Sequence, residues 1–281
     1  MKTNMTQQTF KRRWNGLDAL FSGNWLNKKE YKDGNDRTVN GSAIAQRGLL
    51  AKLAYNFNDS NRLTLSHRQE KTYGERNLRE EFDFSQVGND KNNSPRYRIL
   101  NQDTTNLEYE GKQLGLLGSL KANIYRQTIK REEPTATSNP INKINIIGAN
   151  FGFDTPLLDK HTLKYSLNWR HQESEPASRI GRGSTKTDTG VYAEGIRDFA
   201  PITLTTGVRC DHFKANFSDG KSFTGHNVNP SLGVIYDVNP DLSFSGSLNY
   251  VSGFNEMPPL SNVKPLPTNT IRSMDLSAAP K

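Results

Sequence analysis

Hydrophobic and polar residues alternate along most of this chain. The run from residue 242 to residue 250 shows it most clearly, with Leu242, Phe244, Gly246, Leu248 and Tyr250 alternating with Ser243, Ser245, Ser247 and Asn249. Successive side chains of a β-strand point to opposite faces, so each such run has one apolar face and one polar face. The pattern predicts a sheet. A soluble sheet turns its apolar face to a core and a membrane barrel turns it to lipid, so the alternation alone does not distinguish the two.

Runs of this kind, bounded by clusters of Gly, Asn, Asp and Pro, predict about eleven strands. Their lengths suit tilted strands that cross a bilayer, which takes about 9–11 residues. The predicted strands lie near residues 16–30, 44–57, 62–73, 96–110, 114–130, 143–155, 161–172, 188–198, 202–214, 227–237 and 241–252.

The predicted connections alternate between short and long. The short turns lie at residues 58–61, 111–113, 159–160, 199–201 and 237–240. The long connections are rich in Asp, Asn, Lys, Arg and Gly and lie at residues 31–43, 74–95, 131–142, 173–187 and 215–226. Short turns on one rim and long polar loops on the other are typical of outer-membrane barrels. The sequence therefore predicts an all-β fold, an antiparallel transmembrane β-barrel, with a soluble β-sandwich or soluble barrel as the alternative.

The bulk composition favours the same class. Only 33% of the 281 residues are hydrophobic and the mean hydropathy is −0.77, which is low for a soluble protein with a large buried core. No run of about 18 apolar residues is present, which excludes a bundle of transmembrane helices. A barrel combines low mean hydropathy with membrane residence because half of its strand residues face water. The 13 Phe, 10 Tyr and 3 Trp argue against disorder.

Charge and motif content bear on other functional classes. The formal net charge is +8, but the basic residues are spread along the chain without a binding motif, so we expect no nucleic-acid partner. The single cysteine, Cys210, rules out an intrachain disulfide framework and a cysteine-rich metal site. The residues after Met1 are polar and lack the apolar stretch of a secretory leader. No hydrolase, zinc-protease, Walker or dinucleotide motif occurs, so we expect no enzymatic activity, no cofactor and no bound metal.

A series of motifs in the second half of the chain carries a family resemblance. The motifs are Thr185–Tyr192, Gly207–Phe213 and Asn229–Tyr236, preceded by His161–Tyr165 and Arg170–Glu173, with a looser segment at Lys71–Phe82. In this order and spacing they resemble TonB-dependent outer-membrane receptors, most closely the neisserial iron-regulated ferric-enterobactin receptor group.

The resemblance implies a barrel of 22 strands with a plugged lumen, of which this chain supplies about eleven strands. It also implies import of an iron chelate energised through the TonB complex. Residues 1–252 are then a partial barrel, and residues 253–281 are a remnant of an extracellular loop or an irregular tail. The implied ligand of the full-length form is a ferric siderophore of the catecholate type. The implied location is the outer membrane of a Gram-negative bacterium, with outer-membrane lipid and TonB as further partners.

The sequence also departs from that family. We expect no plug domain and no TonB-contacting segment, Cys210 stands where the family usually has an aromatic residue, and Gly253–Pro259 departs from the usual continuation. These departures predict a gene fragment or a frame-shifted product. A half-barrel would leave two unpaired strand edges in lipid, so we do not expect this chain to carry transport alone.

Basic residues on the predicted polar faces are candidates for attracting an anionic chelate. They are Arg170 and Arg209, together with Lys52, Lys121 and Lys164. The alternative is that they are ordinary lumen residues paired with acids such as Asp211. The long loops are predicted to carry Tyr73, Arg76, Arg79, Arg179 and Arg182, which suit stacking on and pairing with a charged aromatic chelate. Their alternative role is loop solubility.

Two further functions stay open. The five histidines, His67, His161, His171, His212 and His226, are not spaced as paired ligands on one strand face, which argues against direct haem or metal ligation. A haem or haemoglobin uptake receptor nevertheless remains an alternative. So does a structural or adhesin β protein without transport activity.

Overall fold

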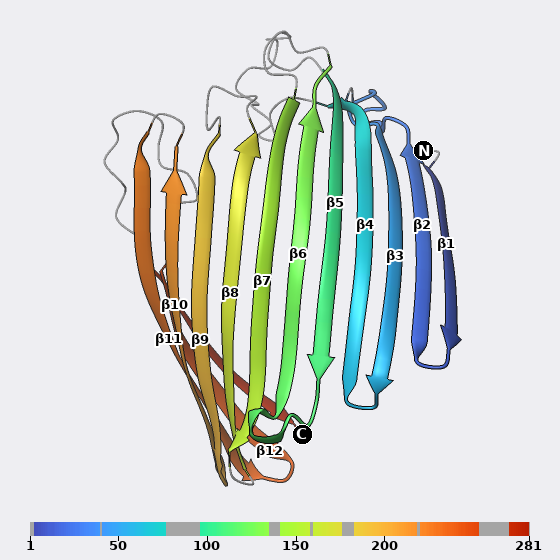
Figure 1. The fold of residues 1–281 in the computed structure, drawn as a ribbon. Coiled ribbons are helices and arrows are strands. Elements are labelled where there is room, and N and C mark those ends of the chain that lie inside the picture. Colours follow the sequence, from blue (N-terminus) through green and yellow to red (C-terminus); the bar gives the residue numbers. More distant parts are fainter. Residues whose placement is uncertain are drawn as a thin grey trace.

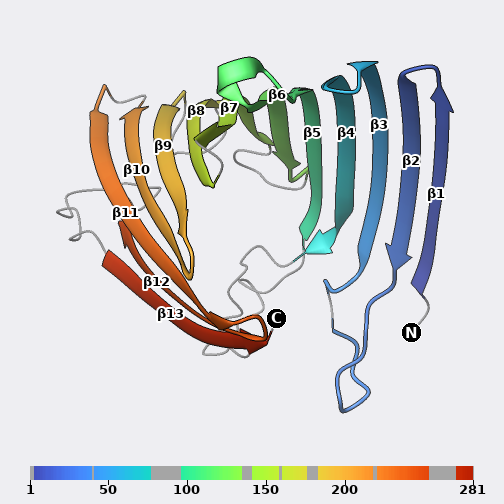
Figure 2. The same cartoon turned by 90° about the horizontal axis from the view of Figure 1, so that it is seen from below.

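The computed structural model describes residues 3–39, 41–76, 96–134, 141–157, 160–175, 183–217, 220–252 and 270–280. These residues form one thirteen-stranded antiparallel sheet in which each strand pairs with its neighbours in sequence. The sheet curves into an open trough with β1 and β13 at its edges (Figures 1 and 2). The strands are β1 (Thr3–Trp14), β2 (Leu17–Lys28), β3 (Ile44–Asn58), β4 (Asn61–Arg76), β5 (Arg96–Gly111), β6 (Ser119–Glu132), β7 (Ile141–Leu157), β8 (His161–Glu175), β9 (Thr185–Phe199), β10 (Ile202–Asn216), β11 (Ser222–Asn239), β12 (Leu242–Ser252) and β13 (Thr270–Pro280).

The eleven predicted strands correspond to β2 through β12, and the all-β antiparallel class is confirmed. Two strands were not predicted. Strand β1 pairs with β2 along its whole length through a tight turn at Asn15 and Gly16, where Gly16 adopts a φ of 75°. A two-residue Asn-Gly turn is a strong hairpin signal, so β1 was readable from the sequence. Strand β13 pairs with β12 inside the segment that was expected to be irregular.

The two rims of the trough differ as predicted, with one exception. The short connections between described strands include residues 15–16, 59–60, 200–201 and 240–241, and they meet at one end of the sheet (Figure 1). The exception is residues 112–118 on the same rim, which contain a 3₁₀ turn, η2 (Gly115–Leu117), so that β6 begins at Ser119 and not near residue 114. On the opposite rim, β10 and β11 stay paired to Asn216 and Ser222, so their connection is shorter than predicted.

The register joins the apolar positions of successive strands into one continuous face, here called the apolar face. Leu167 lies opposite Phe151 and Val191, and Leu232 lies opposite Leu248. Large apolar side chains on this face are solvent-exposed, among them Phe21, Leu53, Leu65, Leu107, Ile124, Phe151, Leu167, Val191, Val208, Leu232 and Leu248. Among the described residues the buried hydrophobic ones are Ala19 and Ala54. Apolar faces therefore do not meet across a dry core, which rules out the soluble sandwich alternative.

The opposite, polar face lines the inside of the trough. Along β10 the apolar-face residues Val208 and Cys210 are exposed, whereas the polar-face residues Arg209 and Asp211 are half-buried. A curved sheet crowds the side chains on its concave side, so the half-buried set marks that side. The described part of the chain contains no helix that is long and apolar enough to cross a membrane.

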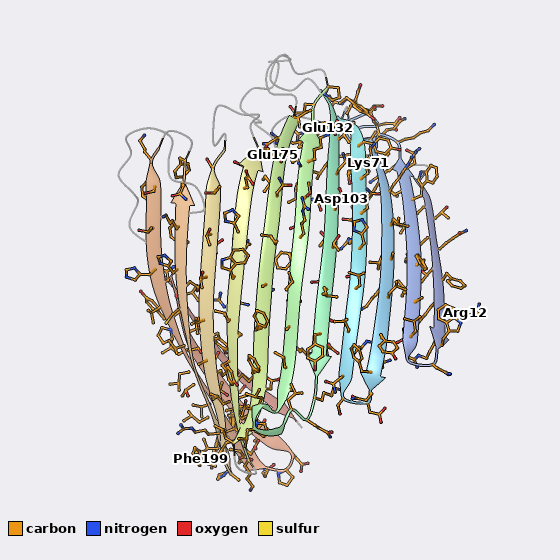
Figure 3. All side chains as sticks on the ribbon, in the orientation of Figure 1. Arg12, Lys71, Asp103, Glu132, Glu175 and Phe199 are labelled. Atoms are coloured by element: carbon orange, nitrogen blue, oxygen red, sulfur yellow. The ribbon has the colours of Figure 1, made fainter. Side chains whose placement is uncertain are left out.

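Apolar and charged residues also separate along the strands. On β8 the apolar face runs from Leu163, Leu167 and Trp169 near the short-turn rim to Glu173 and Glu175 at the other end. In Figure 3 Phe199 lies at the short-turn rim and Lys71, Asp103, Glu132 and Glu175 lie toward the long-loop rim, whereas Arg12 on β1 is a charged exception near the short-turn rim. The exposed apolar residues thus form a band along the apolar face, here called the apolar band. Such a band is the lipid-facing surface of a transmembrane barrel.

Candidate functional site

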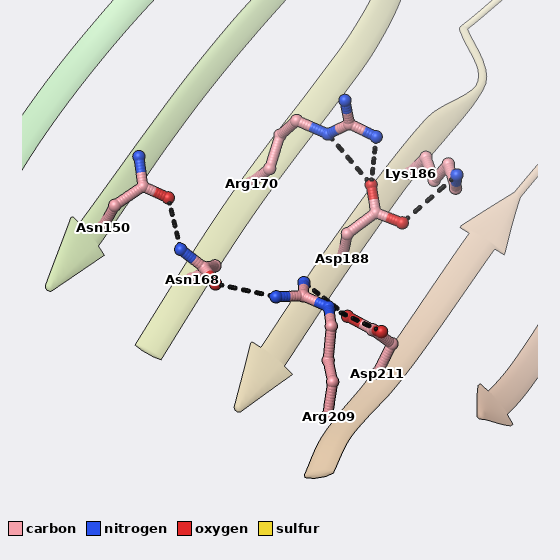
Figure 4. A network of polar contacts seen from close by, with 7 residues as sticks. All are labelled: Asn150, Asn168, Arg170, Lys186, Asp188, Arg209 and Asp211. Carbon is pink, nitrogen blue, oxygen red and sulfur yellow. Dashed lines mark hydrogen bonds and ion pairs between the residues drawn. The ribbon is translucent and has the colours of Figure 1, made fainter. Parts of the chain in front are cut away.

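Two arginine–aspartate pairs lie side by side on the polar face of β8, β9 and β10 (Figure 4). Arg170 donates from Nε and Nη2 to Oδ2 of Asp188, at 3.0 and 2.8 Å. Lys186 adds its ammonium group 3.1 Å from Oδ1 of the same aspartate. Arg209 donates from Nε to Oδ2 of Asp211 at 2.9 Å and from Nη2 to Oδ1 at 2.6 Å. Charge-assisted bonds of this kind hold each guanidinium group in a fixed orientation.

A ladder of asparagine side chains continues from Arg209 across four further strands. Asn168 accepts from Nη1 of Arg209 at 3.2 Å and donates to Asn150 at 2.9 Å. Asn150 donates to Asn123 at 3.0 Å, and Asn123 donates to Asn106 at 2.9 Å. Asn168, Asn150 and Asn123 each donate one of their two N–H groups in the same direction, from β10 toward β5, and Asn106 accepts at the end of the ladder. The four side chains form a row of aligned amides that ends at a guanidinium group.

Gly190 makes the connection between the arginine and the ladder possible. It lies on β9 directly opposite Asn168 on β8 and Asp211 on β10. A Cβ atom at this position would lie 2.5 Å from Nη2 of Arg209 and 2.6 Å from Oδ1 of Asp211. Any side chain here would therefore displace the guanidinium group. The missing side chain leaves a path over β9 along which Arg209 reaches Asn168.

These groups line a shallow hollow of about 350 Å³ on the polar face. Its charged residues are Arg170, Lys186 and Arg209 with Asp188 and Asp211, an excess of one positive charge. Tyr125 and Phe213 add aromatic surface, and Asn150 and Asn168 add amide groups. The hollow therefore combines planar cationic donors, neutral amide donors and aromatic faces, a set that suits an anionic ligand rich in oxygen acceptors.

The structure places the predicted site residues in three groups. Arg170 and Arg209 come together on the polar face, and the pairing of Arg209 with Asp211, expected under the structural alternative, is present. Tyr73 and Arg76 belong to strand β4, so their predicted placement in a loop is wrong, because β4 stays paired with β5 as far as Arg76 and Arg96. Tyr73 lies on the apolar face, opposite Ala45 and Ile99. Arg79, Arg179 and Arg182 lie outside the described residues.

The five histidines occupy the apolar face and not the polar one. His67 hydrogen-bonds Thr105 and His171 hydrogen-bonds Thr187, each at 2.9 Å between directly opposite residues. His212 lies opposite His226, and the ring of His161 packs 5.4 Å from that of Phe199. The described residues contain no group of three or more His, Cys, Asp or Glu side chains that could hold a metal ion.

Asp188, Lys186, Gly190 and the asparagine ladder were not predicted from the sequence. A signal existed, because Asn123, Asn150 and Asn168 each occupy a polar position of a predicted strand. Their alignment depends on the residue-by-residue register of four strands. The pattern of alternation does not determine that register.

The chain matches the family described as TonB dependent receptor-like, beta-barrel, over residues 3–273. No curated protein sequence matches it. The FrpB iron transporter from Neisseria meningitidis (F3-3 variant) superposes with a TM-score of 0.80 at 33% identity, covering 89% of this chain and 45% of FrpB.

Two more distant structures share the fold. The copper transporter OprC has a TM-score of 0.73 at 9% identity and covers 90% of this chain and 44% of its own. A mutant of the ferric enterobactin receptor PfeA from Pseudomonas aeruginosa has a TM-score of 0.68 at 13% identity and covers 89% and 41%. The chain thus spans less than half the length of the structures that it resembles.

The family match and the similarity to the neisserial FrpB confirm the resemblance drawn from residues 161–250. The chain belongs to the TonB-dependent receptor β-barrel family of Gram-negative outer membranes, whose members are receptors and transporters.

Proposed function

We propose that this chain forms the part of an outer-membrane barrel wall that binds a ferric siderophore of the catecholate type. In the full-length protein, this wall serves TonB-dependent import of the chelate across the outer membrane. The similarity to FrpB, an iron transporter, supports iron as the transported element. The structure of PfeA solved with enterobactin shows that a siderophore receptor can share this fold.

The hollow on the polar face is the observation that carries the proposal. A ferric tris-catecholate is an anion whose iron is surrounded by oxygen acceptors and whose rings are aromatic. Arg170 and Arg209 present planar N–H donors and Tyr125 and Phe213 present ring faces to the same hollow. The aspartates keep the guanidinium groups oriented before the ligand arrives, which lowers the entropy cost of binding.

The remaining donors of the ladder extend this surface. Each of Asn123, Asn150 and Asn168 uses one N–H group and its carbonyl within the ladder, which leaves a second N–H for a ligand. A chelate bound beside Arg209 would therefore meet further neutral donors along the trough wall. Neutral donors bind oxygen acceptors less tightly than guanidinium groups do, which suits a surface that a transported ligand must leave.

Titration of the purified protein in detergent with a ferric tris-catecholate, followed by quenching of tryptophan fluorescence, tests the proposal. Arg209→Gln and Arg170→Gln are each expected to weaken binding about tenfold, the loss expected for a hydrogen bond to a charged group. Lys11→Gln is the matched control, since Lys11 lies on the polar face of β1, opposite Leu20, far from the hollow. It removes the same charge and is expected to leave the affinity unchanged.

Two further ligands, a ferric tris-hydroxamate and haem, test the catecholate preference and the siderophore function separately. A neutral ferric tris-hydroxamate is expected to bind at least tenfold more weakly. Equal binding of both chelates would overturn the catecholate preference and leave iron-chelate binding standing. Binding of haem with no binding of either chelate would overturn the siderophore function itself.

A further inference from the structure

Two cations lie directly opposite each other on the apolar face, near the long-loop rim. Arg47 on β3 pairs in register with Lys71 on β4, and on its other side with Trp25 on β2. Directly opposite residues on one face have Cβ atoms about 5 Å apart, and like charges at that spacing destabilise a sheet. The row Trp25–Arg47–Lys71 therefore contains a repulsion that something has to offset.

Aromatic rings supply part of the compensation. The guanidinium carbon of Arg47 lies 4.5 Å from the ring centroid of Trp25 and 5.6 Å from that of Tyr73. The ammonium group of Lys71 lies 5.8 Å from the Tyr73 ring. We call these four residues the boundary cluster. Ring contacts stabilise each cation but do not neutralise the pair.

No acid within the described chain neutralises the cluster. Ion pairs among the described residues involve neither Arg47 nor Lys71. Two carboxylates share this face nearby. Asp103 accepts a hydrogen bond from Gln69 at 2.9 Å, and Glu75, two residues beyond Tyr73, forms no ion pair with the cluster. Both cations are exposed, so the cluster presents two uncompensated charges outward.

The cluster lies where the apolar face changes character. From the short-turn rim, β3 carries Tyr55, Leu53, Ala51 and Leu49 on this face and then reaches Arg47. Tryptophan and tyrosine at such a boundary mark the level of lipid headgroups in membrane barrels. The cations are therefore placed beside a bilayer's charged layer, with the apolar residues of β3 at the level of its acyl chains.

We propose that Trp25, Arg47, Lys71 and Tyr73 bind the phosphate group of a membrane-lipid headgroup. The phosphate bridges the guanidinium and ammonium groups and removes the repulsion between them, while the acyl chains lie along Leu49 and Leu53. The inference rests on the proposed placement of the apolar face in lipid and is independent of which ligand the polar face binds.

Quenching of Trp25 by brominated lipids tests the inference. The chain has three tryptophans, so a Trp14→Phe, Trp169→Phe background leaves Trp25 as the single reporter. In bilayers that mix dibromo-phosphatidylglycerol with unlabelled phosphatidylcholine, and in the converse mixture, quenching gives the relative affinity of each lipid for this site. We expect at least about a fivefold preference for phosphatidylglycerol, since one cation near a membrane surface gives an effect of that order.

Removing the two charges is the decisive comparison. The Arg47→Gln, Lys71→Gln variant is expected to quench equally with both lipids. Lys52→Gln is the matched control, because Lys52 lies on the same strand but pairs with Leu20 and Ser66 on the polar face. It is expected to keep the fivefold preference. Circular dichroism of each variant shows whether the sheet is intact.

Three results would overturn the inference. They are equal quenching in the parent protein, an undiminished preference in the double variant, and a preference abolished by inorganic phosphate but not by chloride at equal ionic strength. The last would identify free phosphate, not a lipid, as the occupant. Failure of the siderophore titration alongside an intact lipid preference would count against the proposed function only.

Discussion

The arginines of the hollow and the cations of the boundary cluster have different kinds of partner. On the polar face, Arg170 and Arg209 each have an aspartate as partner within 3 Å. On the apolar face, Arg47 and Lys71 have aromatic rings as their neighbours and no acid among the described residues. The hollow thus compensates its positive charge within the protein and the boundary cluster does not, although two other cations of the apolar face, Lys130 and Lys143, pair with Glu132 and Glu175 at 2.9 and 2.8 Å.

The medium that each of these two clusters meets accounts for the difference. A ligand site inside a trough benefits from guanidinium groups that are already oriented, and carboxylates on neighbouring strands provide that orientation. At a membrane boundary anionic headgroups can act as counter-ions for exposed cations. We infer that the protein supplies the counter-ions in the hollow and that lipid supplies them at the boundary cluster.

The largest expected effect comes from placing a charge on the wrong face. Leu167→Arg puts a guanidinium group in the middle of the apolar band, and we expect the free energy of unfolding in lipid vesicles to fall by about 2–4 kcal/mol. Ser166→Arg, one residue away on the polar face, is expected to change it by less than about 1 kcal/mol. Urea unfolding followed by tryptophan fluorescence measures both. Equal losses would mean that the two faces meet the same medium.

A smaller effect is expected at Gly190. Gly190→Ala introduces a methyl group 2.5 Å from Arg209, so the guanidinium group must move away from Asn168 and Asp211. We expect a loss of about 1 kcal/mol in unfolding free energy, because the Arg209–Asp211 pair is partly exposed and water can replace its hydrogen bonds. Gly195→Ala on the same strand is the control, because the nearest atom to its Cβ lies at 3.7 Å. A Gly190→Ala variant as stable as this control would contradict the role assigned to the missing side chain at Gly190.

The asparagine ladder should be most sensitive in its middle. Asn150→Ala removes two ladder hydrogen bonds, whereas Asn106→Ala removes the single bond at the end. We expect losses of about 1 kcal/mol and about half of that, since each neutral bond contributes modestly after exchange with water. Unfolding titrations of the two variants, compared with the parent, provide the measurement. The reverse order would contradict the hydrogen bonding assigned to the ladder.

The smallest effect is a gain in stability at the boundary cluster. Lys71→Glu replaces the cation opposite Arg47 by an anion, which turns a repulsive cross-strand pair into an attractive one. We expect the unfolding free energy in neutral detergent to rise by about 0.5 kcal/mol. In anionic lipid the gain should disappear, because the headgroup already supplies the counter-ion. A loss of stability in neutral detergent would argue against repulsion in the native row.

Much of the architecture could be predicted from the sequence, because period-two alternation and turn residues are local signals. They located β2–β12, the two kinds of rim and the polarity of the faces. Strand β1 was not predicted because Thr6 and Gln8 occupy positions of its apolar face, which weakens the alternation. The Asn15–Gly16 turn nevertheless indicates a hairpin.

Less of the site could be predicted from the sequence, because it depends on the register between residues that are distant in the chain. Arg170 and Arg209 were predicted as polar-face cations, but their joint hollow requires Gly190 to stand between Asn168 and Asp211. Tyr73 was assigned to a ligand-binding loop because Gly74 suggested a turn, whereas cross-strand pairing with residues 96–101 continues the strand. Pairing energy here outweighed the local turn preference of glycine.

Accessibility of alternate positions on β10 tests the central claim most directly, that the apolar face meets lipid and the polar face meets water. The native Cys210 reports the apolar face, and single cysteines at Leu204, Thr205 and Val208 in a Cys210→Ser background extend the series. In lipid vesicles a water-soluble maleimide should label position 205 readily and positions 204, 208 and 210 only after detergent is added. Ready labelling at 204, 208 and 210 with protection at 205 would contradict the account.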